Sequence, residues 1–89
     1  MSIKRKAAAL KYEANYEAPI VTAAGMGIIA DNIINTADEN NVPIVYNKEL
    51  ADLLTNVDVG EAIPSELYEI VAEVIAYIMD IDGKVNKKR

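Results

Sequence analysis

The chain has 89 residues and 52% of them are hydrophobic, which suits one folded domain with a small core and argues against a disordered segment. A formal net charge of −5 excludes nucleic acid as the main partner, because phosphate binding needs clustered Lys and Arg. The chain has no Cys and no His, so it lacks thiolate ligands and the commonest general base. Acidic residues interrupt the longest apolar run, so we expect no transmembrane segment and a cytoplasmic location.

The first part of the chain predicts an antiparallel hairpin that follows a flexible N-terminus, residues 1–5. Residues 6–12, KAAALKY, are ambiguous, because Ala and Leu favour a helix whereas the short length favours a strand. Residues 18–23, APIVTA, contain adjacent β-branched side chains that suit a strand. A connection of about five residues is short enough to join two such strands in a hairpin.

The middle of the chain predicts a helix, a strand and a second helix. Apolar residues recur at helical spacing over residues 26–40, and Asn40-Asn41 is a typical helix end. Residues 42–46, VPIVY, are expected to form a short buried strand that follows a right-handed parallel crossover. Asn47 is a favourable N-cap for a helix over residues 48–54.

A long helix is predicted over residues 64–81, opened by Pro64 and ended by Gly83. The resulting order, β-β-α-β-α-α, describes an α/β domain over residues 6–82, in which a small mixed sheet of about three strands is packed by about three helices. A flexible basic tail, residues 83–89, completes the chain.

The long helix carries two apolar strips on its surface. One is wide enough to pack against a sheet and consists of Leu67, Ile70, Val71, Val74 and Ile78. The second consists of Tyr68, Ala72, Ile75 and Met79. A surface helix needs only one apolar face, so this second strip is covered either by another helix of the same chain or by a partner protein.

Two motifs are candidate ligand sites. Gly25-Met26-Gly27-Ile28-Ile29-Ala30 matches a dinucleotide fingerprint, but no acidic residue ends the next strand, and a tight strand-to-helix turn explains the glycines equally well. Asp80-Ile81-Asp82-Gly83 is similar to the start of a calcium loop but lacks its later acidic ligands. We therefore expect no metal, no cofactor and no enzymatic activity, and an anion-binding role ranks third among the functions considered.

Five runs of the sequence occur in the same order and at similar spacing in a known family. They are KAAALKY, APIVTAAGMGIIADNI, VPIV, ELADLL and VGEAIPSELYEIVAEVIAYI. Residues 6–81 thereby resemble the cytoplasmic C-terminal domain of the FlhB/YscU family, the substrate-switch proteins of flagellar and virulence type III export gates. The resemblance implies that residues 6–12 form a strand.

The resemblance also has consequences for the N-terminal end. The family carries an Asn-Pro-Thr-His motif just before this strand and cleaves itself there, whereas Ser2-Ile3-Lys4-Arg5 occupy these positions here. We therefore expect no self-cleavage, and the chain looks like the C-terminal cleavage fragment made as a separate protein. The family's strand before the cleavage site is absent, which predicts an open sheet edge for a partner strand or a homodimer.

A protein-binding surface is also implied by the resemblance. In the family, an Ala-Pro pair and residues of the last helix form a hydrophobic patch that is implicated in receiving export substrates. The matching residues fall partly on the second apolar strip, so the expected site is Ala18, Pro19, Tyr68, Ala72, Ile75 and Met79. The expected partners are export substrates, the hook-length control protein or export-gate components.

Two functions follow from these expectations. The first is a non-catalytic accessory protein of flagellar or type III protein export, peripheral at the export apparatus on the inner membrane. The alternative is a structural or oligomerisation paralogue that makes no contact with export substrates.

Overall fold

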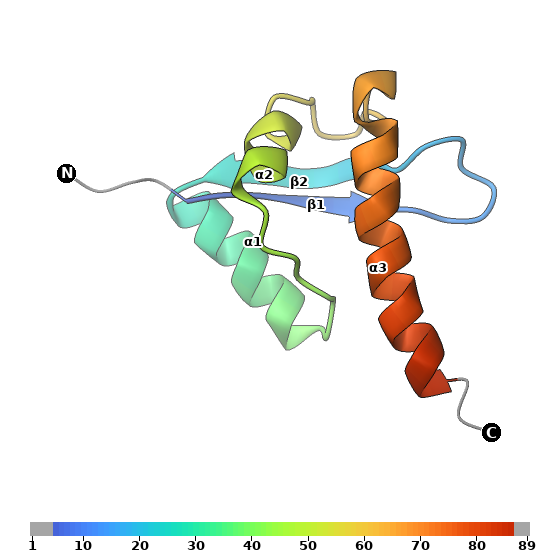
Figure 1. Ribbon diagram of the computed structural model, residues 1–89. Coiled ribbons are helices and arrows are strands. Elements are labelled where there is room, and N and C mark those ends of the chain that lie inside the picture. Colours follow the sequence, from blue (N-terminus) through green and yellow to red (C-terminus); the bar gives the residue numbers. More distant parts are fainter. Residues whose placement is uncertain (1–4, 87–89) are drawn as a thin grey trace.

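The computed structural model describes the backbone of residues 5–86 and the side chains as far as Ile78. Its elements are β1 (Lys6–Lys11), β2 (Ile20–Met26), α1 (Ile28–Glu39), α2 (Lys48–Leu54), a 3-10 turn (Ser65–Leu67) and α3 (Tyr68–Asn86) (Figure 1). The predicted α/β class is confirmed, although the described sheet has two strands rather than about three.

β1 and β2 form the predicted antiparallel hairpin, and the strand interpretation of residues 6–12 is confirmed. The register runs from Lys6 opposite Met26 to Lys11 opposite Ile20, with a shift between Ala9 and Leu10. This shift leaves Thr22 as an extra residue on β2, a β-bulge. Side chains normally alternate between faces along a strand, so the bulge places Val21 and Ala24 on the same face of the sheet.

Helices cover both faces of the hairpin. On one face, Val21 is fully buried beneath side chains of α2 and α3. The main cluster consists of Ala18, Val21, Leu50, Leu54, Ile63, Leu67 and Val71. By strand alternation the buried Ala7 faces the other side, where α1 packs across both strands and buries Ala30.

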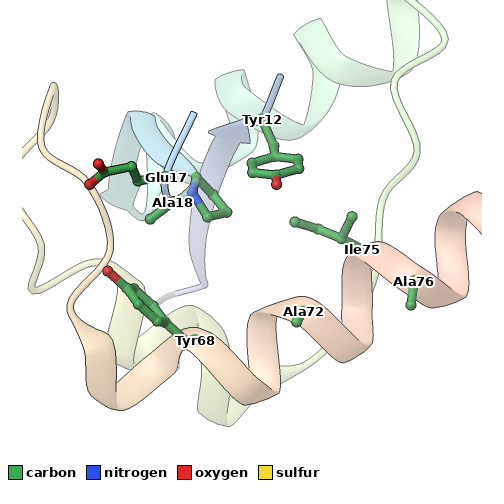
Figure 2. A pocket seen from close by; sticks show the side chains of 8 residues that line it. Tyr12, Glu17, Ala18, Tyr68, Ala72, Ile75 and Ala76 are labelled. Atoms are coloured by element: carbon green, nitrogen blue, oxygen red, sulfur yellow. The ribbon is translucent and has the colours of Figure 1, made fainter. Parts of the chain in front are cut away.

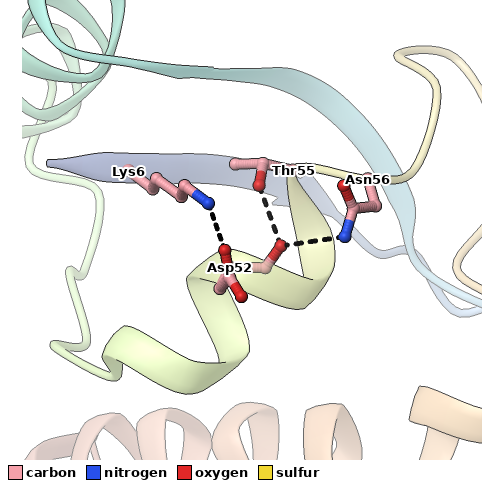
Figure 3. Close-up of polar contacts among 4 residues, drawn as sticks. All are labelled: Lys6, Asp52, Thr55 and Asn56. Atoms are coloured by element: carbon pink, nitrogen blue, oxygen red, sulfur yellow. Dashed lines mark hydrogen bonds and ion pairs between the residues drawn. The ribbon is translucent and has the colours of Figure 1, made fainter. Parts of the chain in front are cut away.

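Polar contacts connect α2 to β1 and cap the C-terminal end of α2 (Figure 3). The Lys6 ammonium forms an ion pair with the Asp52 carboxylate, which links the strand to the helix. Thr55 Oγ1 and Asn56 Nδ2 donate to the backbone oxygen of Asp52 at 2.9 and 3.4 Å. At the other end of α2, the backbone N–H of Leu50 donates to Asn47 Oδ1 at 3.0 Å, so the predicted N-cap is confirmed.

The expected strand over residues 42–46 does not form. The segment lies outside both described strands, so the predicted parallel crossover is wrong as well. It is also not buried, since Val42 and Tyr46 are 51% and 83% exposed. The backbone N–H of Val42 donates to Ala37 at the end of α1, and Pro43 has no N–H to contribute to a ladder.

The helix ends differ from the sequence prediction in three places. Pro64 is followed by the 3-10 turn Ser65–Leu67, so α3 begins at Tyr68 and not at Pro64. α1 begins at Ile28, because Met26 still belongs to β2 and Gly27 makes the turn with φ 64° and ψ −128°. Its predicted end is confirmed, since Asn41 adopts a positive φ of 60°. α3 continues through Gly83 to Asn86, so Gly83 is not its stop.

Candidate protein-binding groove

An open groove lies between the hairpin loop and α3 (Figure 2). It has a volume of about 360 Å³ and is lined by Tyr12, Glu17, Ala18, Pro19, Tyr68, Ala72, Ile75 and Ala76. We call this surface the apolar groove, since Glu17 is its one charged lining residue. Its size falls within the range of sites that bind small molecules or a few side chains of a peptide.

The local folding of two elements produces the groove. The hairpin connection brings Ala18 and Pro19 under α3, where both are buried and supply the floor. Ile63 N–H donates to the Pro19 carbonyl at 3.0 Å, which holds this part of the loop against the segment that precedes α3. On α3, Ala72 and Ala76 lie one turn apart, and their small side chains leave the hollow.

Two tyrosines form the walls of the apolar groove. Tyr12 is 45% exposed and Tyr68 is 47% exposed, so each ring has one covered and one accessible part. In Figure 2 the Tyr12 ring lies near Ile75, while the Tyr68 hydroxyl points toward the end of the groove where Glu17 lies. Aromatic rings with a polar tip are well suited to a surface that is apolar inside and wet at its edge.

Five of the six residues expected from the sequence line this one groove. Ala18 and Pro19 form its floor, and Tyr68, Ala72 and Ile75 come from α3. Ala72 is exposed and Ile75 is half-buried, so within the described protomer the second apolar strip is not covered by another helix. The sixth residue, Met79, belongs to α3, but its side chain lies outside the described part of the chain.

Sequence reasoning missed three lining residues. Ala76 follows Ala72 by four positions and could have been found from helical spacing. Tyr12 and Glu17 belong to the hairpin connection, and no periodic signal places a loop residue beside a helix that begins about fifty residues later.

The charges beside the groove are mostly acidic. Lys11 Nζ lies 3.6 Å from Glu13 Oε2, and the Tyr16 hydroxyl together with this carboxylate raises the pKa of the Lys11 ammonium. The other described ion pairs, Arg5 with Asp31 and Lys6 with Asp52, involve no groove residue. Glu17 therefore has no ion-pair partner among the residues that the structure describes.

The hairpin has a second accessible feature, the outer edge of β1. The start of β2 is covered, because Val21 N–H donates to the Glu61 carbonyl at 3.0 Å and Gly60 N–H donates to the Val21 carbonyl at 2.7 Å. In the described part of the chain, β1 pairs only with β2, so its other edge carries no strand. Exposed apolar side chains near the end of β2 include Met26, Ile28 and Ile29.

Backbone geometry accounts for both glycines of the fingerprint-like motif. Gly27 has a positive φ of 64°, and a Cβ on Gly25 would lie 2.3 Å from Ile29 Cγ2. The motif therefore has a structural explanation without a nucleotide.

The model of the family described as "FlhB HrpN YscU SpaS Family" matches residues 4–78 of the chain. The chain belongs to this family. The FlhB/YscU membership connects it with flagellar biosynthesis and type III protein export.

FlhB/YscU relatives of two lengths match the chain. The Bacillus subtilis protein YlqH is 43% identical over 86 residues, which is 96% of this chain and 92% of that protein. The flagellar biosynthetic protein FlhB of Aquifex aeolicus is 44% identical over 81 residues, or 89% of this chain. The chain spans only 23% of that FlhB and 20% of the Escherichia coli FlhB, to which it is 40% identical over 75 residues.

Solved FlhB/YscU structures share the fold. The cytoplasmic domain of FlhB from Shewanella putrefaciens matches 93% of this chain and 69% of its own, with a TM-score of 0.85 and 30% identity. The PscU C-terminal domain matches 83% of this chain and 96% of its own, with a TM-score of 0.79 and 25% identity. Within the described residues, no helix has the length and apolar character needed to cross a bilayer.

Proposed function

We propose that the protein is a non-catalytic accessory of flagellar or type III export and binds export substrates or components of the switch or gate through the apolar groove. The observation that carries this proposal is the location of Ala18, Pro19, Tyr68, Ala72 and Ile75 around one accessible hollow. Such a surface binds short apolar segments by excluding water, while a few anchor side chains set the affinity. Its site of action would be the cytoplasmic side of the export apparatus.

The exposure of the groove residues supports a binding role over a packing role. Other large apolar side chains such as Tyr46 are also exposed, but Tyr12 and Tyr68 differ in lining one hollow together with Ala72. The apolar groove also has a floor of buried residues and two aromatic walls, which is the anatomy of a site for an apolar segment rather than of a flat surface.

The substitution Ala72→Asp tests the proposal. Ala72 is exposed on α3, so we expect the free energy of unfolding to change by at most about 1 kcal/mol, mainly through helix propensity. We expect binding to fall by about tenfold or more, because a bound apolar segment would cover the new carboxylate without pairing it. Quantitative mass spectrometry of proteins that co-purify with tagged wild-type and variant protein measures the loss of export substrates and gate components.

Asn35→Asp is the matched control. It adds the same charge to an exposed position of α1, away from the groove, and should leave binding unchanged. Unfolding of the Ala72→Asp variant would assign Ala72 to the core, and equal recovery of export components with both variants would contradict a binding role for the groove.

The open edge of β1 favours a second candidate function, a structural or oligomerisation module. An unpaired edge offers backbone N–H and C=O groups to another strand. Sedimentation velocity separates the two candidates. A tight dimer that persists in Ala72→Asp favours this module, whereas a monomer over the whole concentration series argues against it.

A further inference from the structure

The two ends of the apolar groove differ in chemical character. Figure 2 shows Glu17 and the Tyr68 hydroxyl at one end. Ile75 and Ala76 lie at the other end, with the Tyr12 ring near Ile75. Among the lining side chains, an extended segment lying along the groove would therefore meet the Glu17 carboxylate at one end and mainly apolar surface at the other.

Further acidic residues border the groove on α3. At about 100° per residue, Glu69 and Glu73 project beside Ala72 and Ala76, on the side of the helix away from Ile75. Both glutamates are exposed, and neither belongs to an ion pair among the described residues. The Lys11 ammonium lies 3.6 Å from Glu13 instead, in an exposed ion pair.

We propose that the segment accepted by the apolar groove is an apolar stretch flanked by lysine or arginine, with its cation at the Glu17 end. This inference rests on the proposed function and adds the charge and the direction of the bound segment. The apolar part covers Ala72 and Ile75, and the cation lies between the Glu17 carboxylate and the accessible part of the Tyr68 ring.

Physical chemistry assigns different roles to the two parts of such a segment. Excluded apolar area supplies most of the affinity, because an exposed ion pair contributes little in water. The carboxylates instead select among apolar segments, since an acidic segment would be repelled by Glu17, Glu69 and Glu73. The half-exposed Tyr68 ring adds a face on which an ammonium or guanidinium group can stack.

Selection from a displayed library of random twelve-residue peptides tests the inference and does not require the natural ligand to be identified. The library is selected in parallel on the wild-type protein and on Ala72→Asp. We expect the wild type to enrich peptides in which Lys or Arg adjoins an apolar stretch, and Ala72→Asp to lose this enrichment. A selected peptide is then titrated by fluorescence anisotropy against the wild type, Glu17→Gln and Glu39→Gln.

Glu39→Gln is the matched control, because Glu39 is an exposed carboxylate at the end of α1 and lines no part of the groove. We expect Glu17→Gln to weaken binding of the basic peptide about three- to fivefold, the effect of losing one exposed ion pair. Added salt should reduce this difference, and a peptide with Gln in place of its cations should bind both proteins equally.

The outcomes separate this inference from the proposed function. Enrichment of apolar peptides without Lys or Arg, or an equal effect of Glu17→Gln and Glu39→Gln, overturns the inference and leaves the groove as a binding site. If the wild type selects only peptides that the folded Ala72→Asp variant also selects, the groove is not a binding site. That result overturns both the inference and the proposed function.

Discussion

Gly27 is the residue at which the hairpin becomes a helix. Its φ of 64° and ψ of −128° lie in a region that side chains with a Cβ rarely enter. The Gly27 N–H donates to the Arg5 carbonyl at 2.8 Å, and Asp31 N–H donates back to the Gly27 carbonyl at 3.0 Å. Gly27 therefore makes the last hydrogen bond beside the hairpin through its N–H and accepts the first hydrogen bond of α1 through its carbonyl.

Gly27→Ala should lower the free energy of unfolding by about 1–3 kcal/mol through backbone strain. A Cβ at this position meets no atom within 4 Å, so steric contact adds nothing to the cost. Urea denaturation followed by circular dichroism measures the change. An unchanged midpoint would mean that the turn relaxes to another conformation, and the strain argument would be wrong.

At the scale of elements, α2 shows how a short helix becomes stable in tertiary context. Its seven residues are too few for an isolated helix in water. Leu50 and Leu54 are buried in the main cluster, and the Asn47 side chain caps the first turn. The partly exposed Lys6–Asp52 ion pair adds a surface contact between α2 and β1.

Asn47→Ala removes the cap of α2 and should destabilise the protein by about 1 kcal/mol, because the Leu50 N–H loses its side-chain acceptor. Asn47→Asp is the matched control, since Asp accepts the same hydrogen bond. Thermal unfolding of the three proteins compares them. Equal loss of stability in Asn47→Asp would show that the amide matters for another reason than capping.

The whole molecule is a hairpin with helices on both faces, and its two accessible features lie in different places. The apolar groove needs the hairpin connection and α3 together, whereas the open edge belongs to β1. The N-terminal residues Ser2-Ile3-Lys4, which take positions of the family's cleavage motif, lie outside the described residues, while Arg5 precedes β1.

The purified protein is expected to remain in one piece. By the family resemblance, Ser2 and Ile3 take the places of the Asn and Pro of the cleavage motif, so we expect no Asn cyclisation at this point. Intact-mass spectrometry after prolonged incubation should find only the full-length mass. An FlhB cytoplasmic domain that carries the motif is the positive control, and a cut within residues 2–5 of this chain would contradict the prediction.

Local pattern in the sequence is enough to predict β2, α2 and its cap, the body of α1 and the two strips of α3, whereas β1 needed the family resemblance. The locally predicted features depend on residues that are close together in the sequence, so their spacing and propensity can be determined from the sequence alone. Five groove residues are also predictable, although Ala18 and Pro19 follow from family resemblance rather than from periodicity.

Only the tertiary structure decided which of these segments meet. Residues 42–46 have the composition of a strand, but a strand needs a neighbour, and the described fold offers their backbone none. Tyr12 and Glu17 became groove residues because the hairpin connection packs beside α3, a long-range contact that local sequence does not encode. Propensity is a property of a few adjacent residues, whereas pairing and burial are properties of segments that are distant in sequence, and for that reason the groove is complete only in the folded chain.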